Sequence, residues 1–239
     1  VEDLLYGLML RSGNDCAEAL ALHTSGSIDA FAQRMNETAQ KAGALESCFK
    51  NPHGLPLEGH YTTARDLNLI ACYAMQNDAF RQIVGTRYYQ PRNWANKNKM
   101  LKNYEGAVGI KTGYTKQAGR CLVSAAEKKG MTLVCTVLNC SPMYERSQQL
   151  LDEAFAAYEN VRILGADTPV RVKVKGKTEA GYTKEDLYYP LLPEEQLHLK
   201  MEIISREEMG AMGKNDEIIG QIKIYLINRL LFSRNLYKL

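Results

Sequence analysis

The chain has 239 residues, of which 45% are hydrophobic and 24% are charged, the balance of an ordinary globular protein. Its formal net charge of +3 is spread over both halves, so neither half has the basic excess that nucleic acid or an anionic membrane would require. No apolar run approaches the ~20 residues that span a bilayer, and the first residues lack a signal-peptide pattern.

Four helices are expected in the first third of the chain. Residues 2–10 place apolar side chains three and four positions apart, and Ser12-Gly13 interrupts this pattern. Each of the next three helices has a suitable cap: Asn14 or Asp15 for the second helix, Ser27 for the third, and Thr62 or Thr63 for the fourth. The expected helices cover residues 2–10, 14–22, 27–42 and 63–75.

The pattern then changes to that of a sheet. Residues 121–126 and 131–138 are strand-like and are joined by a charged turn that ends at Gly130, which predicts an antiparallel hairpin. Residues 108–113 are expected to form a third strand, and residues 142–159 return to a helical pattern. Helices, a sheet and a closing helix predict an α+β domain.

Beyond residue 164 strict alternation of apolar and polar side chains predicts a small all-β domain. We therefore expect two domains, residues 1–164 and 165–239. The apolar residues 222–227 could form a final strand or lie on a membrane, and the alternation before them favours the strand.

The chain begins at Val1 inside a helical pattern, without Met and without a cap, which suggests a fragment of a longer protein. The six cysteines show no C-x-x-C pair, and the histidines do not cluster with them, so no metal site is expected. Most cysteines lie in apolar runs, which favours buried thiols over disulfides.

Two tripeptides carry the functional signal, Ser12-Gly13-Asn14 and Lys111-Thr112-Gly113. The first lies in a break between two helices, where short polar side chains can point into a cleft. The second lies at the end of an expected strand, where glycine lets a substrate backbone approach closely. Each tripeptide alone is weak evidence, but the pair in this order indicates a penicillin-sensitive serine acyltransferase.

The surrounding sequence carries a family resemblance over residues 1 to about 164. Residues 49–56 (FKNPHGLP), 62–67 (TTARDL) and 109–115 (GIKTGYT) closely resemble the low-molecular-mass penicillin-binding proteins, the serine-type D-alanyl-D-alanine carboxypeptidases. The resemblance implies a β-lactamase/transpeptidase-like domain, incomplete at its N-terminus, and the β domain after it looks like that family's C-terminal module.

The resemblance also implies roles for individual residues. Three residues would form the catalytic group. Ser12 would relay a proton, Asn14 would bind the substrate amide, and Lys111 would add positive charge to the cleft. Thr112 and Gly113 would line the strand against which the substrate docks, with Lys111 and Thr112 near its terminal carboxylate. Thr115 would also belong to the substrate-binding residues.

His53 and Asp66 match positions at the rim of the site in relatives. A carboxylate at Asp66 could order the loop beside the cleft. His53 could equally be a loop residue satisfied by backbone groups, and Asp66 could pair with Arg65 or stabilise the start of a helix.

A serine nucleophile in this family comes from a Ser-x-x-Lys at the start of a helix. Ser47 to Lys50 is the one match in the sequence, but it follows Ser12, and Pro52 prevents the required helix from continuing. We therefore expect that the chain lacks the nucleophile, is inactive alone, and is unstable without a complementary N-terminal piece.

By resemblance, the full enzyme removes the terminal D-alanine from peptidoglycan stem peptides ending in D-Ala-D-Ala, through an acyl-serine and without metal or cofactor. It would act at the outer face of the cytoplasmic membrane, with β-lactam antibiotics as inhibitors and no nucleic acid partner. Two alternatives are a non-catalytic module that binds cell-wall peptides and a class A β-lactamase. The latter needs a glutamate before the Lys-Thr-Gly strand, and Glu105 lies too close to that strand.

Overall fold

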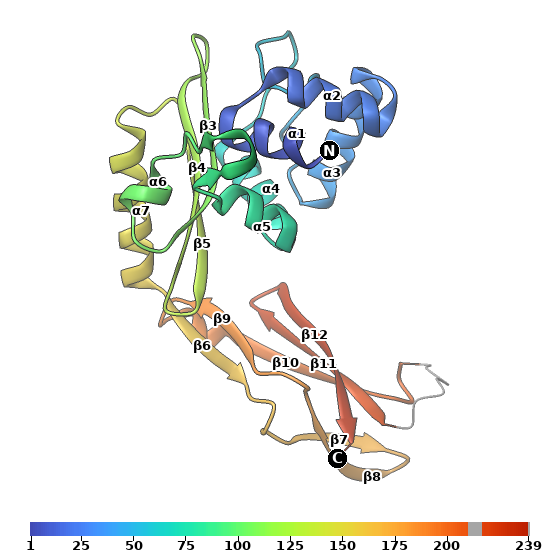
Figure 1. Ribbon diagram of the computed structural model, residues 1–239. Coiled ribbons are helices and arrows are strands. Elements are labelled where there is room, and N and C mark those ends of the chain that lie inside the picture. Colours follow the sequence, from blue (N-terminus) through green and yellow to red (C-terminus); the bar gives the residue numbers. More distant parts are fainter. Residues whose placement is uncertain (210–216, 239) are drawn as a thin grey trace. The chain divides into compact units, whose positions relative to one another are not determined.

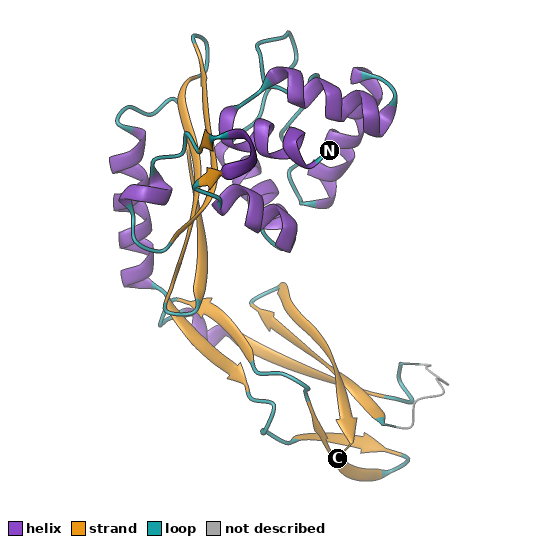
Figure 2. Ribbon diagram, in the orientation of Figure 1, coloured by secondary structure: helices purple, strands orange, loops and turns teal. Residues whose placement is uncertain are grey.

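The computed structural model describes residues 1–209 and 217–238, which form two compact units, Val1–Phe155 and Ala156–Leu239 (Figure 1). The first unit combines helices with a sheet, and the second consists mainly of strands (Figure 2). The α+β class expected from the sequence is confirmed. Strand β6 (Glu159–Leu164) pairs with β9 (Leu187–Leu191), so residues that precede the expected boundary at 164 pair within the second unit.

Three helices of the first unit begin at short polar side chains that cap them, whereas the helix that starts at Asn14 follows Gly13 and has no side-chain cap, so the cap expected at Asn14 or Asp15 is wrong. Ser27 accepts a hydrogen bond from the amide of Ala30, 3.1 Å away, and Thr63 accepts one from the amide of Asp66, also 3.1 Å away. Both caps were expected. Asn77 caps a further helix that the sequence pattern did not reveal. The helices are α1 (Glu2–Tyr6), the π-helix η1 (Gly7–Arg11), α2 (Asn14–Ser25), α3 (Ile28–Lys41), α4 (Ala64–Ala74), α5 (Asp78–Gly85), the 3-10 helix η2 (Gln90–Arg92), α6 (Met100–Asn103) and α7 (Met143–Ala157).

A three-stranded antiparallel sheet forms the centre of this unit. Its strands are β3 (Ala107–Thr115), β4 (Gly119–Lys128) and β5 (Met131–Val137), with β4 in the middle, which confirms the expected hairpin and third strand. Two short strands, β1 (Tyr88–Tyr89) and β2 (Trp94–Ala95), form a separate pair.

Helices cover both faces of the sheet. On one face α4 and α5 contribute Ala71, Met75 and Val84 to a buried cluster with Ile110 and Ala125 of the strands. Helix α7 lies on the opposite side of the sheet from α4 and α5 (Figure 1). The sheet is therefore held on both sides, and its strand β3 is a fixed support for the residues of the Lys-Thr-Gly tripeptide.

The second unit builds its core from alternating strands. A five-stranded sheet has the order β10-β11-β12-β8-β7, and side chains such as Val172, Ile222 and Leu236 are fully buried. Residues 222–226 belong to β11, so the strand interpretation of this segment is confirmed. The further elements are β7 (Val170–Val174), β8 (Lys177–Tyr182), the 3-10 helix η3 (Glu195–His198), β10 (Leu199–Ser205), β11 (Ile218–Leu226) and β12 (Arg229–Lys238).

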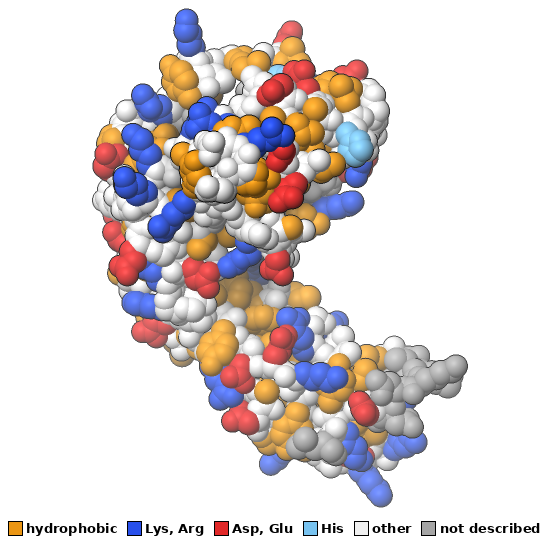
Figure 3. Space-filling view, viewed as in Figure 1, with side chains coloured by type: hydrophobic (Ala, Val, Ile, Leu, Met, Phe, Trp, Pro, Cys, Tyr) orange, Lys and Arg blue, Asp and Glu red, His pale blue; other side chains and the backbone are white. Residues whose placement is uncertain are grey.

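Acidic and basic side chains are intermixed over both units on the face shown in Figure 3. No helix in the part of the chain that the structure describes is long and apolar enough to cross a membrane. None of the six cysteines forms a disulfide. Cys16 and Cys135 are buried, as expected, whereas Cys72 is exposed, because helix α4 turns that position outward.

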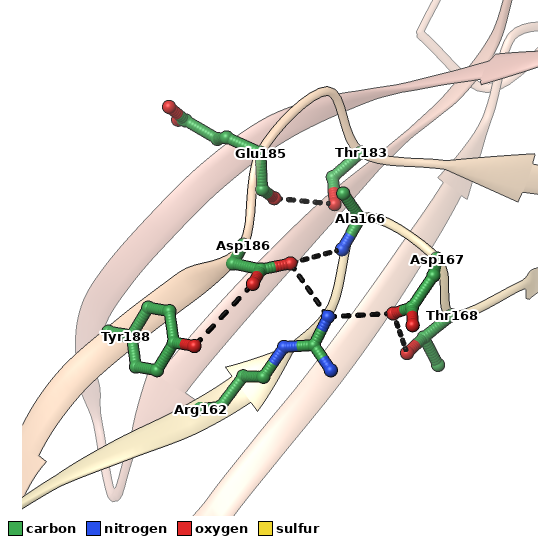
Figure 4. Close-up of polar contacts among 8 residues, drawn as sticks. All are labelled: Arg162, Ala166, Asp167, Thr168, Thr183, Glu185, Asp186 and Tyr188. Carbon is green, nitrogen blue, oxygen red and sulfur yellow. Dashed lines mark hydrogen bonds and ion pairs between the residues drawn. The ribbon is translucent and has the colours of Figure 1, made fainter.

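A polar network joins the loops at one end of the second unit (Figure 4). The guanidinium of Arg162 donates to Asp167, 2.7 Å away, and to Asp186, 2.8 Å away. Asp186 also accepts a hydrogen bond of 2.8 Å from the amide of Ala166. The hydrogen bond from Arg162 and, as a smaller cause, the hydrogen bond from the Ala166 amide favour the ionised carboxylate of Asp186. They therefore lower the pKa of Asp186 below its ordinary value.

The network makes the stability of the second unit depend on pH. The pKa of Asp186 is lower in the folded protein than its ordinary value of 3.8. Its ionised carboxylate therefore stabilises the fold above pH 3.8, and this stabilisation is lost as the pH falls through the pKa of the folded protein. We expect Asp186→Asn to lower the unfolding temperature of this unit at pH 7 and to have less effect at pH 3. Thermal unfolding followed by circular dichroism at both pH values tests this. Equal shifts at the two pH values would contradict it.

Candidate functional site

Ser12 occupies a special backbone position at the junction of two helices. The π-helix η1 ends at Ser12, whose φ of 60° and ψ of 44° lie in the left-handed region. The amide of Gly13 reaches back to the carbonyl of Gly7, 3.2 Å away, and helix α2 begins at the next residue. Both π-turns and left-handed non-glycine residues concentrate at functional sites. The sequence predicted the break between the helices but not its left-handed geometry.

Lys111 meets Ser12 from a distant part of the chain. It lies on β3, and its Nζ donates to the hydroxyl of Ser12, 99 positions away, and to the carbonyl of Thr112 at 2.8 Å. Desolvation by burial, with repulsion from Lys97 as a smaller cause, lowers the pKa of Lys111 to about 8. An ammonium with a pKa this close to neutrality can exchange a proton with the hydroxyl that it contacts.

The two tripeptides open onto one cavity of about 810 Å³ within the first unit. Its wall includes Ser12 and Asn14 from the first tripeptide, and all of Lys111, Thr112 and Gly113 from the second. The structure thus brings together the expected catalytic and substrate-binding residues, Thr115 included, and His53, expected at the rim, lies on the same wall.

The cavity wall carries positive charge only. Lys97, Lys111 and Arg120 line it, together with two histidines, and no Asp or Glu occurs among the described residues that line it. Uncompensated cations in a partly desolvated cavity favour an anionic ligand. Lys97 and Arg120 could not be selected from the sequence, because neither belongs to a motif and only the fold places them beside the tripeptides.

Asp66 lies behind the cavity and is not part of its wall. Its side chain is fully buried, and its Oδ2 accepts hydrogen bonds from the amide of Glu46 at 2.7 Å and from the hydroxyl of Ser47 at 2.8 Å. Arg65 lies 3.8 Å from Oδ1 and is largely exposed. Asp66 therefore anchors the residues that precede the loop on the cavity wall.

That loop presents His53 to the cavity. The Nδ1 of His53 accepts a hydrogen bond from the amide of Leu55 at 3.2 Å, and its Nε2 lies 3.5 Å from a carboxylate oxygen of Glu18. Asn51 closes the turn by accepting from the amide of Gly54 at 2.7 Å and donating to the carbonyl of Leu55. The contacts that hold His53 are those of a loop residue, while its position on the wall gives it access to a ligand.

Within the ranges that the structure describes, no three or more His, Cys, Asp or Glu side chains gather in a way that could hold a metal ion.

Comparison with known proteins places this site in a family. The family model described as D-alanyl-D-alanine carboxypeptidase, peptidase S11, matches residues 1–141. The chain belongs to this family. A D-alanyl-D-alanine carboxypeptidase DacF from Bacillus subtilis is 37% identical over 186 residues, which cover 73% of this chain and 48% of that protein. DacA from Escherichia coli is 30% identical over 99% of this chain and 62% of its own length.

Solved structures of carboxypeptidase relatives share the fold. Penicillin binding protein 5 from Haemophilus influenzae aligns with a TM-score of 0.72 and 26% identity over 99% of this chain and 73% of that one. The Streptomyces K15 DD-transpeptidase aligns with a TM-score of 0.60 and 36% identity over 65% of this chain and 68% of that one. The chain spans about half the length of the first curated relatives it matches, 48% and 54%.

Proposed function

We propose that the chain forms the peptide-binding cleft and the proton-relay groups of a serine-type D-Ala-D-Ala carboxypeptidase that acts on peptidoglycan stem peptides. The observation that carries the proposal is the hydrogen bond between Lys111 and Ser12 on the wall of the cavity. Ser12 would relay a proton through Lys111, and Asn14 would bind the substrate amide. The site would act outside the cytoplasmic membrane and would accept β-lactams as substrate mimics.

Strand β3 supports the docking part of this proposal. It lies at the edge of the three-stranded sheet, since among the described strands β4 alone pairs with it. Thr112, Gly113 and Thr115 line the cavity from this edge, so an extended peptide would meet their backbone groups directly. A β-carbon at Gly113 would lie 3.7 Å from the β-carbon of Cys121, an ordinary van der Waals contact, so the protein itself leaves room beside this residue.

The serine in the one Ser-x-x-Lys among residues 1–239 is held away from this cleft. The hydroxyl of Ser47 donates to Asp66 and shares a 2.8 Å hydrogen bond with the hydroxyl of Thr62. Ser47 does not belong to the cavity wall. We therefore expect residues 1–239 on their own to bind substrate without forming an acyl-serine at Ser47.

The proposal predicts selective and reversible peptide binding. Diacetyl-L-Lys-D-Ala-D-Ala should bind the chain saturably in isothermal titration calorimetry. Its isomer with two L-alanines should bind about tenfold more weakly, because it cannot make the same polar contacts. Equal binding of the two isomers, or no binding of either, would contradict the proposal.

Intact-protein mass after incubation with benzylpenicillin is the companion measurement. We expect an unchanged mass, with benzylpenicillin competing for the peptide site. A stoichiometric adduct that disappears in Ser47→Ala would show that Ser47 is the nucleophile and would overturn its structural assignment.

A non-catalytic module that only binds cell-wall peptides is the second candidate, favoured by the contacts that hold Ser47 outside the cavity. The two candidates differ at Lys111. Simple binding needs only a permanent positive charge, whereas a relay needs a lysine that releases its proton, and the lowered pKa of about 8 favours the relay. A class A β-lactamase has less support, since no glutamate occurs among the described residues of the cavity wall.

A further inference from the structure

Strand β10 forms one edge of the five-stranded sheet in the second unit. Among the described strands β11 alone pairs with it. Its four residues 200–203 are all exposed, and two of them are large apolar side chains, Met201 at 50% and Ile203 at 42%. An edge strand with unpaired backbone groups and exposed apolar side chains is a surface to which another strand can add.

The backbone groups of β10 alternate between β11 and the open edge. The carbonyl of His198, just before the strand, accepts a hydrogen bond of 3.1 Å from the amide of Ile227 on the β11 side. The amide of Arg206, just after the strand, donates one of 3.1 Å to the carbonyl of Ile219. Even-numbered residues therefore turn toward β11. In an antiparallel ladder the residues between them face away, so the odd-numbered residues of β10 turn their amides and carbonyls outward.

The C-terminal end of this edge is occupied by the chain itself. The outward amide of Ser205 donates to the carboxylate of Glu208, 2.8 Å away. The turn after β7 also reaches this end, where the amide of Lys175 donates to Glu207 at 2.8 Å. The part of the edge that a partner strand can reach is therefore residues 199–203.

Two opposite charges on β10 are complementary to those of a second, reversed copy. Lys200 and Glu202 share one face of the strand, where Tyr225 of β11 donates to Glu202 at 3.0 Å. If two copies pair antiparallel with Met201 opposite Met201, each Lys200 lies opposite Glu202 of the other copy. These positions do not exchange backbone hydrogen bonds, so their side chains come closest. A shift by two residues in either direction would instead oppose two copies of Lys200 or two of Glu202, which is unfavourable.

The same register brings apolar side chains together on the other face. Leu199 lies opposite Ile203 of the second copy, and Met201 lies opposite its counterpart, so every outward amide and carbonyl of these residues gains a partner. Within one chain Met201 pairs with Ile224 and Ile203 pairs with Ile222, both fully buried. The apolar core of each unit thereby continues across the contact.

We propose that β10 is a self-recognition edge, through which the second unit pairs with a second copy of this chain in the register centred on Met201. The order Lys-Met-Glu selects a copy of the same strand, because it is complementary to itself when reversed. The inference concerns the second unit alone, so it holds or fails independently of the proposed function.

Sedimentation velocity of the 239-residue chain measures this association. We expect a reversible monomer–dimer equilibrium between about 10 μM and 1 mM, because a strand pair of this length is smaller than a standard interface. Glu202→Lys should raise the dissociation constant at least about tenfold, since it sets lysine against lysine at two symmetric positions. Met201→Pro should have at least as large an effect, because proline removes the central outward amide while breaking no hydrogen bond to β11.

Charge exchange makes the test specific to this register. Glu202→Lys and Lys200→Glu should each be monomeric alone, whereas their equimolar mixture should form a mixed dimer in which every lysine faces a glutamate. The double variant that exchanges the two residues should dimerise like the unmodified chain. Lys116→Glu is the matched control, since it makes the same charge change at an exposed turn of the first unit. Its dissociation constant should stay within about twofold of the original.

Three outcomes would overturn the proposal. The unmodified chain could remain monomeric over the whole concentration range, its dimer could persist in both Glu202→Lys and Met201→Pro, or the mixture of charge-reversed variants could fail to associate. Circular dichroism of each variant establishes that it is folded. If Met201→Pro does not fold, the charge-reversed pair decides, because exposed charges change at residues 200 and 202 while the backbone keeps all its donors.

Discussion

Binding of a D-Ala-D-Ala peptide should weaken about tenfold when Lys111 is replaced by methionine, which removes one charged donor from the cavity wall while keeping its bulk. In the unmodified chain the affinity should also fall as pH rises through about 8, the value to which desolvation lowers the pKa of Lys111. An anionic ligand prefers the protonated lysine, so binding is strongest below this pKa and weaker above it. Titration calorimetry between pH 7 and 9.5 measures both effects.

Two variants serve as controls for Lys111. In Lys111→Met the decrease of affinity between pH 7 and 9.5 should disappear. In Lys97→Met it should move to higher pH, because the repulsion that helps to lower the pKa of Lys111 is removed. His60, which also lines the cavity, does not interfere, since burial lowers its pKa and it is neutral throughout this range. A decrease that persists unchanged in Lys111→Met would show that another group titrates.

The second large effect is expected from Asp66→Ala, which should lower the free energy of unfolding of the first unit by about 2–4 kcal/mol. The change leaves the amide of Glu46 and the hydroxyl of Ser47 without the acceptor they contact at 2.7 and 2.8 Å. These part-buried donors lose an acceptor, and removal of the fully buried Asp66 side chain leaves a cavity behind it. Urea unfolding followed by circular dichroism measures the loss.

Asp29→Ala is the matched control for Asp66. Asp29 also lies in the first turn of a helix, but it is exposed. Asp29→Ala should lower the free energy of unfolding by no more than about 0.5 kcal/mol, which is the stabilisation expected from a favourable charge at a helix end. A similar loss in both variants would show that Asp66 acts only through the helix end and does not anchor the segment at Glu46.

The sequence predicted those parts of the fold whose signals are local. Ser27 and Thr63 cap helices because a side-chain oxygen can meet an amide three residues ahead; the sequence identified Ser27 and left Thr63 as one of two candidates with Thr62. The β4–β5 hairpin followed from alternation on either side of a turn at Gly130. Helix α5 was missed, because its eight residues give too short a pattern to stand out from the polar segments around it.

The site was predictable only where motifs mark it. Ser12 and Lys111 were chosen from their tripeptides, but their contact depends on the packing of η1 against β3 and has no local signal. Arg120 could not be selected, since only the pairing of β4 with β3 brings it to the cavity wall. Asp66 was placed at the rim by resemblance, and only the structure shows that it is fully buried and binds the segment before the loop.

The bond between Ser12 and Lys111 also has a consequence for how the chain folds. Its two residues are 99 positions apart, so the entropy of closing a long loop must be overcome before they meet. During synthesis residues 7–25 are made long before residues 107–115. Any opening that releases β3 separates Lys111 from Ser12 and so dismantles the site, even where each tripeptide keeps its local structure.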